Sequence, residues 1–165
     1  MKKIYLLRHA KAIGGGDMSD HERTLSDDGV LQIQDVAEQF IDDSISIDTV
    51  LCSSATRTQQ TFELLLQNGV MLPTAQIIDN LYLASASDIL NNIHTLDNKY
   101  NNVMIIGHNP GIATLCQAFN SKNLNQSDKH SLLTFPPATL AIIEYNGKSW
   151  EELTPQLANL VCCRS

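Results

Sequence analysis

The chain has 165 residues, of which 43% are hydrophobic and 18% charged, and a formal net charge of −7. This length and mix are typical of one globular domain, residues 1–165, with a continuous core. The acidic balance disfavours a nucleic acid or an anionic membrane as partner, because neither attracts an acidic protein over long range. No segment is apolar for long enough to span a bilayer, and Arg8 interrupts the first apolar run too early for a signal peptide. We therefore expect a cytoplasmic monomer.

The first apolar run ends abruptly in two basic side chains. Ile4 to Leu7 predicts a strand buried on both faces, so Arg8 and His9 should emerge at its carboxyl end. Open α/β sheets bind ligands in the crevice at that edge.

A polar segment follows. Gly14, Gly15 and Gly16 lack the Lys-Ser/Thr pair of a phosphate loop, so we interpret the segment up to Arg23 as a mobile loop bordering the site. Ser26 then predicts a helix N-cap. The expected buried stripe of this helix is Val30, Ile33, Val36, Ala37, Phe40 and Ile41.

A second strand is predicted from Thr49 to Ser54, leading into a helix that Ser53 or Ser54 could cap. Arg57 falls in the first turn of that helix, where its charge opposes the helix dipole. A bound anion would justify an arginine there. The expected apolar face of the helix is Phe62, Leu65 and Leu66.

The middle of the chain predicts a short strand, Ala75 to Ile78, and a helix from Ser87 to about Leu96. The most apolar strand, Asn102 to Gly107, ends at His108. Asn109 as N-cap and Pro110 as first helical residue would place His108 at a helix amino terminus, where anions bind.

Near the end of the chain, Asn146-Gly147 predicts a hairpin turn between strands Thr139–Tyr145 and Ser149–Leu153. This hairpin would add an antiparallel edge to a mostly parallel sheet in an α/β fold. The cysteines show no C-x-x-C spacing, and two of them are adjacent near the end of the chain, so we interpret them as free thiols. They are Cys52, Cys116, Cys162 and Cys163.

Three strand ends thus deliver Arg8, His9, Arg57 and His108 to one edge. Arginine disfavours a metal site, and no His-x-x-x-His or carboxylate cluster accompanies the pair of histidines. A cysteine phosphatase needs five residues between its cysteine and arginine, whereas four separate Cys52 from Arg57. What remains is a metal-free and cofactor-free phosphoryl site, in which arginines hold the oxygens and a neutral imidazole attacks phosphorus.

These motifs resemble those of the histidine phosphatase (phosphoglycerate mutase-like) superfamily, in its small phosphohistidine phosphatase (SixA-type) branch. The segments that carry the resemblance are Leu7 to Lys11, Arg23 to Gly29, Ser53 to Thr61 and Gly107 to Gly111. The resemblance implies a three-layer α/β/α sandwich. It also implies that His9 is phosphorylated during turnover, and that Arg8, Arg57 and His108 bind the phosphoryl group, with Arg23 as a further substrate-binding residue.

Two residues depart from the pattern of the larger family members. Ala10 replaces the glycine after the histidine, and Asn80 stands where a glutamate would protonate the leaving alcohol. Asp79 and Asp88 are alternative acids. A phosphohistidine phosphatase can dispense with a strong acid, because imidazole, with a pKa of about 6.5, is a far better leaving group than an alkoxide.

We therefore expect a phosphohistidine phosphatase that acts on a phosphohistidine-bearing partner protein in signal transduction, through a phospho-His9 intermediate. A domain without a covering insertion should leave its pocket open to such a partner. Two alternatives are a phosphatase of small phosphate esters or anhydrides in the same superfamily, and a phosphate-binding module without turnover. The presence of His9 disfavours the second alternative, because binding alone needs no nucleophile.

Overall fold

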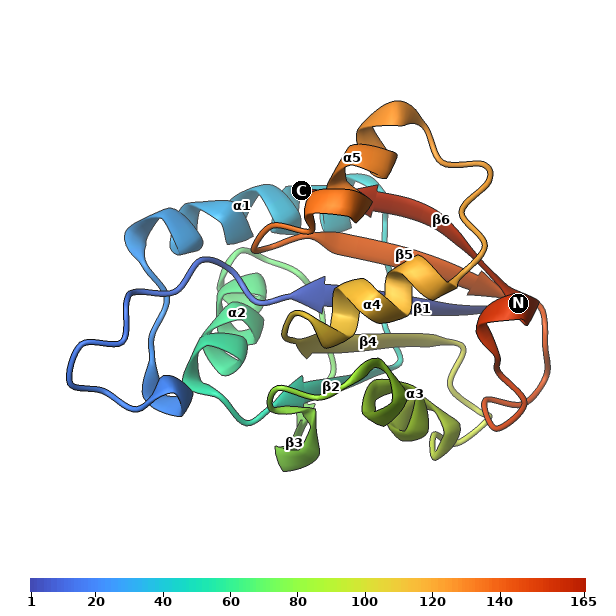
Figure 1. Cartoon of the computed structure of the whole chain (residues 1–165), viewed down its shortest axis with the longest axis horizontal. Coiled ribbons are helices and arrows are strands. Elements are labelled where there is room, and N and C mark those ends of the chain that lie inside the picture. The colour runs from blue at the N-terminus through green and yellow to red at the C-terminus, as the bar shows by residue number, and fades with distance from the viewer.

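The computed structural model describes residues 1–165 and forms one mixed six-stranded sheet (Figure 1). The strands are β1 (Lys2–Arg8), β2 (Thr49–Ser53), β3 (Ala75–Ile78), β4 (Asn102–Gly107), β5 (Leu140–Tyr145) and β6 (Ala158–Arg164). Their order across the sheet is β3-β2-β4-β1-β5-β6. The first four in this order run parallel, whereas β5 is antiparallel to both of its neighbours.

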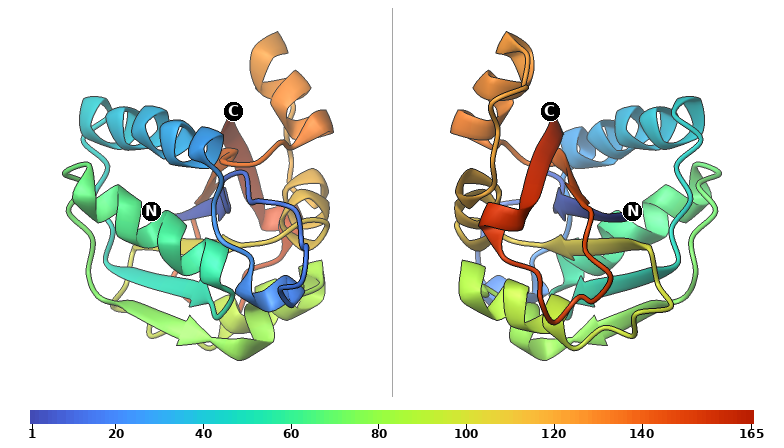
Figure 2. Two further views of the ribbon diagram at one scale, coloured as in Figure 1. Left: turned by 90° about the vertical axis from the view of Figure 1, so that its left-hand side faces the viewer. Right: turned by 90° about the vertical axis from the view of Figure 1, so that its right-hand side faces the viewer.

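Helices cover both faces of the sheet, with α1 and α2 on one side and α3, α4 and α5 on the other (Figure 2). They span α1 (Asp27–Asp42), α2 (Thr56–Gln67), α3 (Ala86–His94), α4 (Gly111–Ala118) and α5 (Gln126–Thr134). Short 3₁₀ turns occur at η1 (Asp20–Glu22), η2 (Asp79–Leu81) and η3 (Pro155–Leu157). The three-layer α/β/α sandwich is therefore confirmed.

The central strands have one continuous apolar sequence because each packs against helices on both faces. In β1, Ile4 and Leu6 belong to the core beneath α3 and α4, while Tyr5 and Leu7 belong to the core beneath α1 and α2. The predicted strand from Asn102 to Gly107, now β4, lies between β2 and β1. The carboxyl ends of three parallel strands therefore meet at one edge of the sheet.

The predicted carboxyl-terminal hairpin is wrong in its second strand. Residues Ser149–Leu153 form no strand, because Trp150 and Leu153 turn inward and are fully buried. The indole Nε1 of Trp150 donates to the carbonyl oxygen of Tyr100 over 3.1 Å. The partner of β5 is instead β6, which contains Cys162 and Cys163. The antiparallel strand β5 is thus internal, and β6 is the edge.

Several predicted helix caps are also wrong. Neither Ser53 nor Ser54 caps α2, whose N-cap position is Ala55. The cap of α3 is Ser85 rather than Ser87. These serines were plausible N-caps because a serine side chain often accepts a hydrogen bond from the first turn of a helix. The hydroxyls of Ser53 and Ser54 form hydrogen bonds with histidines instead.

Helix α4 begins at Gly111, with Pro110 rather than Asn109 at its N-cap position. Helix α5 was not predicted at all. Its sequence is mostly polar and buries only three side chains, so no apolar periodicity revealed it. The predicted buried faces of α1 and α2 each included one residue that is exposed: Ile41 is 53% and Leu66 41% exposed.

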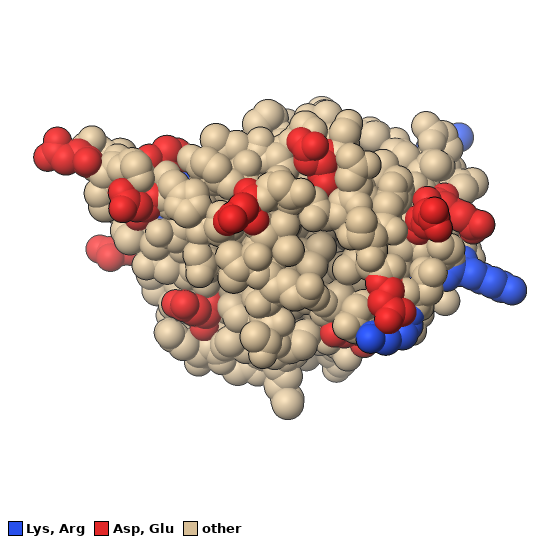
Figure 3. Space-filling view, turned by 90° about the horizontal axis from the view of Figure 1, so that it is seen from below, with Lys and Arg blue, Asp and Glu red and all other residues tan.

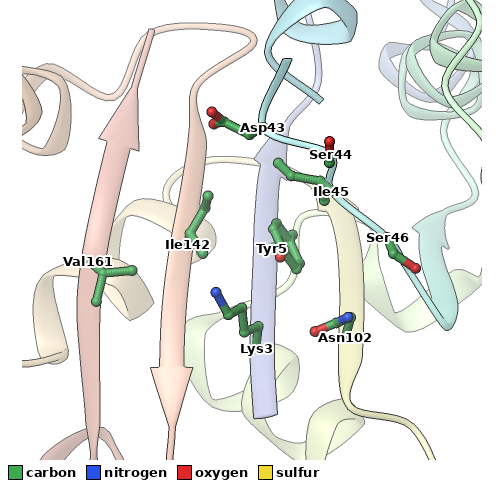
Figure 4. Close-up of a pocket in the computed structure, with 9 residues that line it drawn as sticks. All are labelled: Lys3, Tyr5, Asp43, Ser44, Ile45, Ser46, Asn102, Ile142 and Val161. Carbon is green, nitrogen blue, oxygen red and sulfur yellow. The ribbon is translucent and has the colours of Figure 1, made fainter. Parts of the chain in front are cut away.

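A surface hollow of about 360 Å³ lies on the sheet face beside the turn at residues 43–46 (Figure 4). Its lining includes Lys3 and Asn102, from the amino-terminal parts of β1 and β4, and no arginine or histidine. Lys3 is already paired with Glu144 at 3.0 Å. This hollow therefore offers no phosphoryl chemistry.

None of the helices combines the length and apolar character needed to cross a bilayer.

Candidate active site

The three strand ends bring His9, Arg57 and His108 into contact. His9 follows β1, His108 follows β4, and Arg57 lies in the first turn of α2, after β2. The two imidazole centroids are 5.1 Å apart. Arg57 bridges the rings, with its Nε 3.3 Å from His9 Nε2 and its Nη2 3.3 Å from His108 Nδ1. The three strand ends thus bring these residues together, as predicted from the sequence.

The backbone fixes the tautomer of His9. Its Nδ1 lies 2.7 Å from the carbonyl oxygen of Ala10. Because a carbonyl oxygen can only accept, Nδ1 carries the proton and Nε2 keeps its lone pair. Nε2 accepts from Arg57 and faces the centre of the cluster. His9 is therefore prepared as a neutral nucleophile.

His108 is held in the opposite tautomer. Its Nδ1 accepts a hydrogen bond from Arg57. Nε2 therefore carries the ring proton and donates to Ser53 Oγ over 2.7 Å. This contact explains why Ser53 does not cap α2. The serine hydroxyl is used to orient the second histidine.

Burial keeps both rings neutral. Desolvation, followed by the nearby arginine charges, lowers the pKa of His9 to about 4. Desolvation, with the charges of His9 and Arg57 next, lowers the pKa of His108 to about 3. The hydrogen bond of His9 to Ala10 opposes the first shift without reversing it. An unprotonated nucleophile is thus available throughout the neutral range.

We expect nuclear magnetic resonance to show both rings still neutral when pH is lowered to about 5, below the usual histidine pKa of ~6.5. The unfolded chain gains protons near its ordinary histidine pKa, whereas folded His9 stays neutral down to about pH 4. The free energy of unfolding should therefore fall as pH falls through that window. Spectra of His9→Ala and His108→Ala assign the signals. A midpoint of about 6.5 for either ring would contradict this assignment of neutral histidines.

Arg8 lies beside the cluster but does not join its hydrogen bonds. Its Nη1 donates over 2.7 Å to the carbonyl oxygen of Phe135, the residue that ends α5. Asn109 Nδ2 donates to the same oxygen over 3.0 Å. Arg8 Nε is buried without any partner. An unpaired buried N–H is costly, so Arg8 retains a donor for a ligand.

The loop between β1 and α1 covers the cluster. Asp20 accepts from Arg57 Nη2 at 3.0 Å and from the Tyr82 hydroxyl at 2.6 Å. Arg23 does not touch the histidines or Arg57, and its Nη1 donates to Asp20 over 2.9 Å. His21 pairs with Ser54 Oγ at 3.0 Å. The predicted loop therefore borders the site. Arg23 contacts Asp20, which in turn contacts Arg57.

The pocket is closed, which contradicts the expectation of an open one. His9 is 9%, Arg57 3% and His108 2% exposed. None of the surface hollows is lined by any of these three residues. The loop that carries Asp20 covers the site, and no inserted domain is involved. The short chain length therefore gave no sign that the site would be covered.

Neither Asp79 nor Asp88 takes the place of the missing acid. Asp88 is used in the capping box of α3 with Ser85. Asp79 is exposed and starts η2, and Asn80 Oδ1 accepts from Asn92 on α3. From this turn it is Tyr82 that reaches the site, edge-on to His108 with centroids 5.6 Å apart.

The four cysteines are free and buried, as expected. Burial raises the pKa of Cys52 to about 12, so its thiol is not a nucleophile. Nowhere in the chain do three or more His, Cys, Asp or Glu side chains gather as metal ligands.

Sequence reasoning missed Asp20, Tyr82 and Ser53 as members of the site. Asp20 has a weak signal, because it stands three residues before Arg23 in a charged loop. Tyr82 has none. Its role depends on the path of η2 past the end of β2, which is a tertiary feature.

Known protein sequences match this chain in part or over most of its length. The sequence model of the histidine phosphatase superfamily (branch 1) matches residues 4–81. An uncharacterized protein of Mycobacterium tuberculosis is 26% identical over 157 residues, covering 94% of this chain and 96% of that protein.

Two solved structures share the fold over nearly the whole chain. A protein of Nakamurella multipartitia, provisionally named phosphohistidine phosphatase SixA, is 24% identical with a TM-score of 0.84, covering 99% of this chain and 95% of that one. A protein of Agrobacterium tumefaciens with the same provisional name is 25% identical with a TM-score of 0.77, covering 99% and 98%. The fold of the chain is that of these SixA-type structures, and residues 4–81 match the histidine phosphatase superfamily (branch 1).

Proposed function

We propose that this protein is a phosphohistidine phosphatase that works through a phospho-His9 intermediate. The observation that carries the proposal is the fixed tautomer of His9, whose Nδ1–H donates to Ala10 and whose Nε2 lone pair faces Arg57. A group that merely binds phosphate needs no lone pair at that position. This orientation argues against a phosphate-binding module without turnover.

The reaction has two steps. His9 Nε2 attacks phosphorus in line, the P–N bond of the substrate breaks, and the leaving imidazole departs. Arg8 and Arg57 hold the equatorial oxygens, and His108 joins them once its Nδ1, which accepts from Arg57 in the resting site, has gained a proton. Water then attacks the phospho-His9 phosphorus, releasing phosphate and a proton and restoring neutral His9.

The leaving group explains why no strong acid is needed. Phosphohistidine can carry a proton on its second ring nitrogen, so its imidazole leaves in the neutral form. An alkoxide would need a proton in the transition state. The engaged side chains of Asp88 and Asn80 offer none, which favours phosphohistidine over simple esters.

A phosphatase of small esters or anhydrides remains the second candidate, and the closed pocket favours it. A covered site with His9 9% exposed admits a small molecule more readily than a side chain on a folded partner. For a partner protein to react, the loop that carries Asp20 must move.

The deciding experiment compares the purified protein on a phosphohistidine-bearing protein and on small phosphate esters, with inorganic phosphate as the common readout. Faster turnover of the phosphohistidine, in kcat/KM, supports the first proposal. A preference for the small esters would favour the second candidate.

Arg57 should be required for the rate. Replacing it with alanine removes a donor from the transition state, which typically costs about 3 kcal/mol, or roughly a hundredfold in kcat. Lysine should restore little, because a point charge cannot form the planar fork. Arg164→Ala is the matched control, because Arg164 contacts only Asp43 among acidic groups, at 2.8 Å.

Chelator should leave wild-type turnover unchanged. Two results would contradict this description of the clamp: full activity in Arg57→Ala, or a loss with EDTA that a divalent cation reverses.

A further inference from the structure

Asp20 places a negative charge on the arginine that should receive the phosphoryl group. Arg57 donates through Nη2 to the carboxylate of Asp20 at 3.0 Å and through Nη1 to the Asp20 carbonyl oxygen. The Tyr82 hydroxyl and Arg23 Nη1 donate to the same carboxylate. Three side chains from η2, α2 and the loop thus hold one internal anion over the site.

These contacts use most of the hydrogen-bonding capacity of Arg57. Its Nε points at His9 Nε2, the atom that must attack phosphorus, and its Nη2 is shared between Asp20 and His108 Nδ1. A guanidinium has five N–H donors, and a phosphoryl oxygen can reach them only by replacing existing partners. The resting site is therefore satisfied internally, without an anion from solution.

We propose that Asp20 is a specificity-determining residue: its carboxylate competes with the phosphoryl group for Arg57, so that a substrate must supply binding energy beyond its phosphate to open the site. Small free oxyanions lack such additional contacts and bind weakly. A phosphorylated side chain on a larger partner gains contacts outside the clamp, which offset the loss of the Asp20 pairing. This inference rests on the proposed function and narrows its substrate class.

The loop can release Asp20 without disturbing its own base. The base is held by Ile13 N to the Thr24 carbonyl at 2.9 Å and by Arg23 Nε to the Ile13 carbonyl at 2.8 Å. Between these anchors lie three glycines, of which Gly16 has a φ of +51°, a conformation that glycine adopts at little cost. Residues 14–22 can therefore swing as a unit once the contacts of Asp20 and the hydrogen bond of His21 to Ser54 break.

The overall charge of the molecule acts in the same direction. The face of the molecule seen in Figure 3 carries more acidic than basic side chains, in keeping with the net charge of −7. Such a surface repels free anions at long range. A small phosphate must therefore overcome both the general field and the local pairing of Asp20 with Arg57.

The test measures the binding of tungstate, a phosphate-like oxyanion, by calorimetry in wild type and in Asp20→Asn. Asparagine keeps the size of the side chain and a neutral acceptor for Tyr82 and Arg57. Removing the competing charge should tighten binding by roughly tenfold, the worth of about one charge-assisted hydrogen bond. Asp17→Asn is the matched control, because Asp17 is an exposed acid of the same loop with no hydrogen-bond partner. Its tungstate affinity should equal that of wild type.

Tyr82→Phe provides a second route if Asp20→Asn does not fold. It removes one donor from Asp20 and keeps the ring, so it should also tighten tungstate binding, by a smaller factor. Unchanged or weaker binding in Asp20→Asn would overturn the proposal, because Asp20 would then only position Arg57. An equal gain in Asp17→Asn would overturn it too, since the effect would be one of general charge. Because binding is measured without turnover, these outcomes do not depend on whether the substrate is phosphohistidine.

Discussion

Replacing His9 with alanine should abolish turnover while the fold remains intact. No neighbour can replace the nucleophile, because the other unprotonated ring nitrogen at Arg57, His108 Nδ1, is bonded to Nη2 rather than to Nε. Loss of a covalent nucleophile typically lowers kcat on the order of a millionfold. The small change in volume at one buried position should leave the circular dichroism spectrum unchanged.

Labelled substrate provides a positive readout of the same step. Rapid acid-free quenching should trap wild-type protein carrying label at His9 as an acid-labile phosphoramidate, and the His9→Ala protein should carry none. His130→Ala is the matched control, because His130 is exposed on α5 and should retain full activity. Undiminished turnover in folded His9→Ala would rule out the covalent mechanism.

The sequence predicted the parallel half of the fold well, because there a local signal and the tertiary role coincide. Strands β1, β2 and β4 are short apolar runs that end in polar residues, and each is buried on both faces. The carboxyl-terminal part was harder. Trp150 and Leu153 look like strand residues but fill the core, while the partner strand Ala158–Arg164 contains polar residues and two cysteines.

The site residues that directly follow a strand could be predicted, whereas those positioned by loops or by distant residues could not. His9, Arg57 and His108 follow strand ends, so the parallel topology alone brings them together. Arg8 is adjacent in sequence, yet its side chain is held by Phe135, a residue with no recognisable motif. The closure by Asp20 could not be predicted, because it depends on how the loop folds back over α2 and η2.

The closure by Asp20 also explains why the pocket is not open, as the size of the domain had suggested. A small domain can lack an insertion and still bury its clamp, provided that a short loop supplies an internal counter-anion. Tyr82 and Arg23 hold that counter-anion and lower the pKa of Asp20 well below its usual range, with the Tyr82 hydrogen bond as the largest cause. The carboxylate therefore stays charged at every pH at which the protein is expected to work.

Because no general acid protonates the leaving group, the rate should depend steeply on the pKa of that group. Without a proton donor, negative charge accumulates on the departing atom, so kcat/KM should fall as the leaving group becomes more basic. Aryl phosphates should react readily, and alkyl phosphates slower by at least about 10²–10⁴, the usual contribution of general acid catalysis. The measurement is a plot of log kcat/KM against leaving-group pKa, which reports the phosphorylation step.

Two variants determine how that plot is interpreted. Asp79→Asn and Asp88→Asn should leave the slope unchanged, because Asp88 is bound in the capping box and Asp79 is exposed at the start of η2. A flat wild-type plot that becomes steep in Asp79→Asn would identify Asp79 as the acid, after movement of the η2 turn. In that case alkyl esters would be competent substrates, and the balance would shift to the small-ester phosphatase. A steep wild-type plot, unchanged in both variants, would leave phosphohistidine as the substrate whose leaving group the site can release unaided.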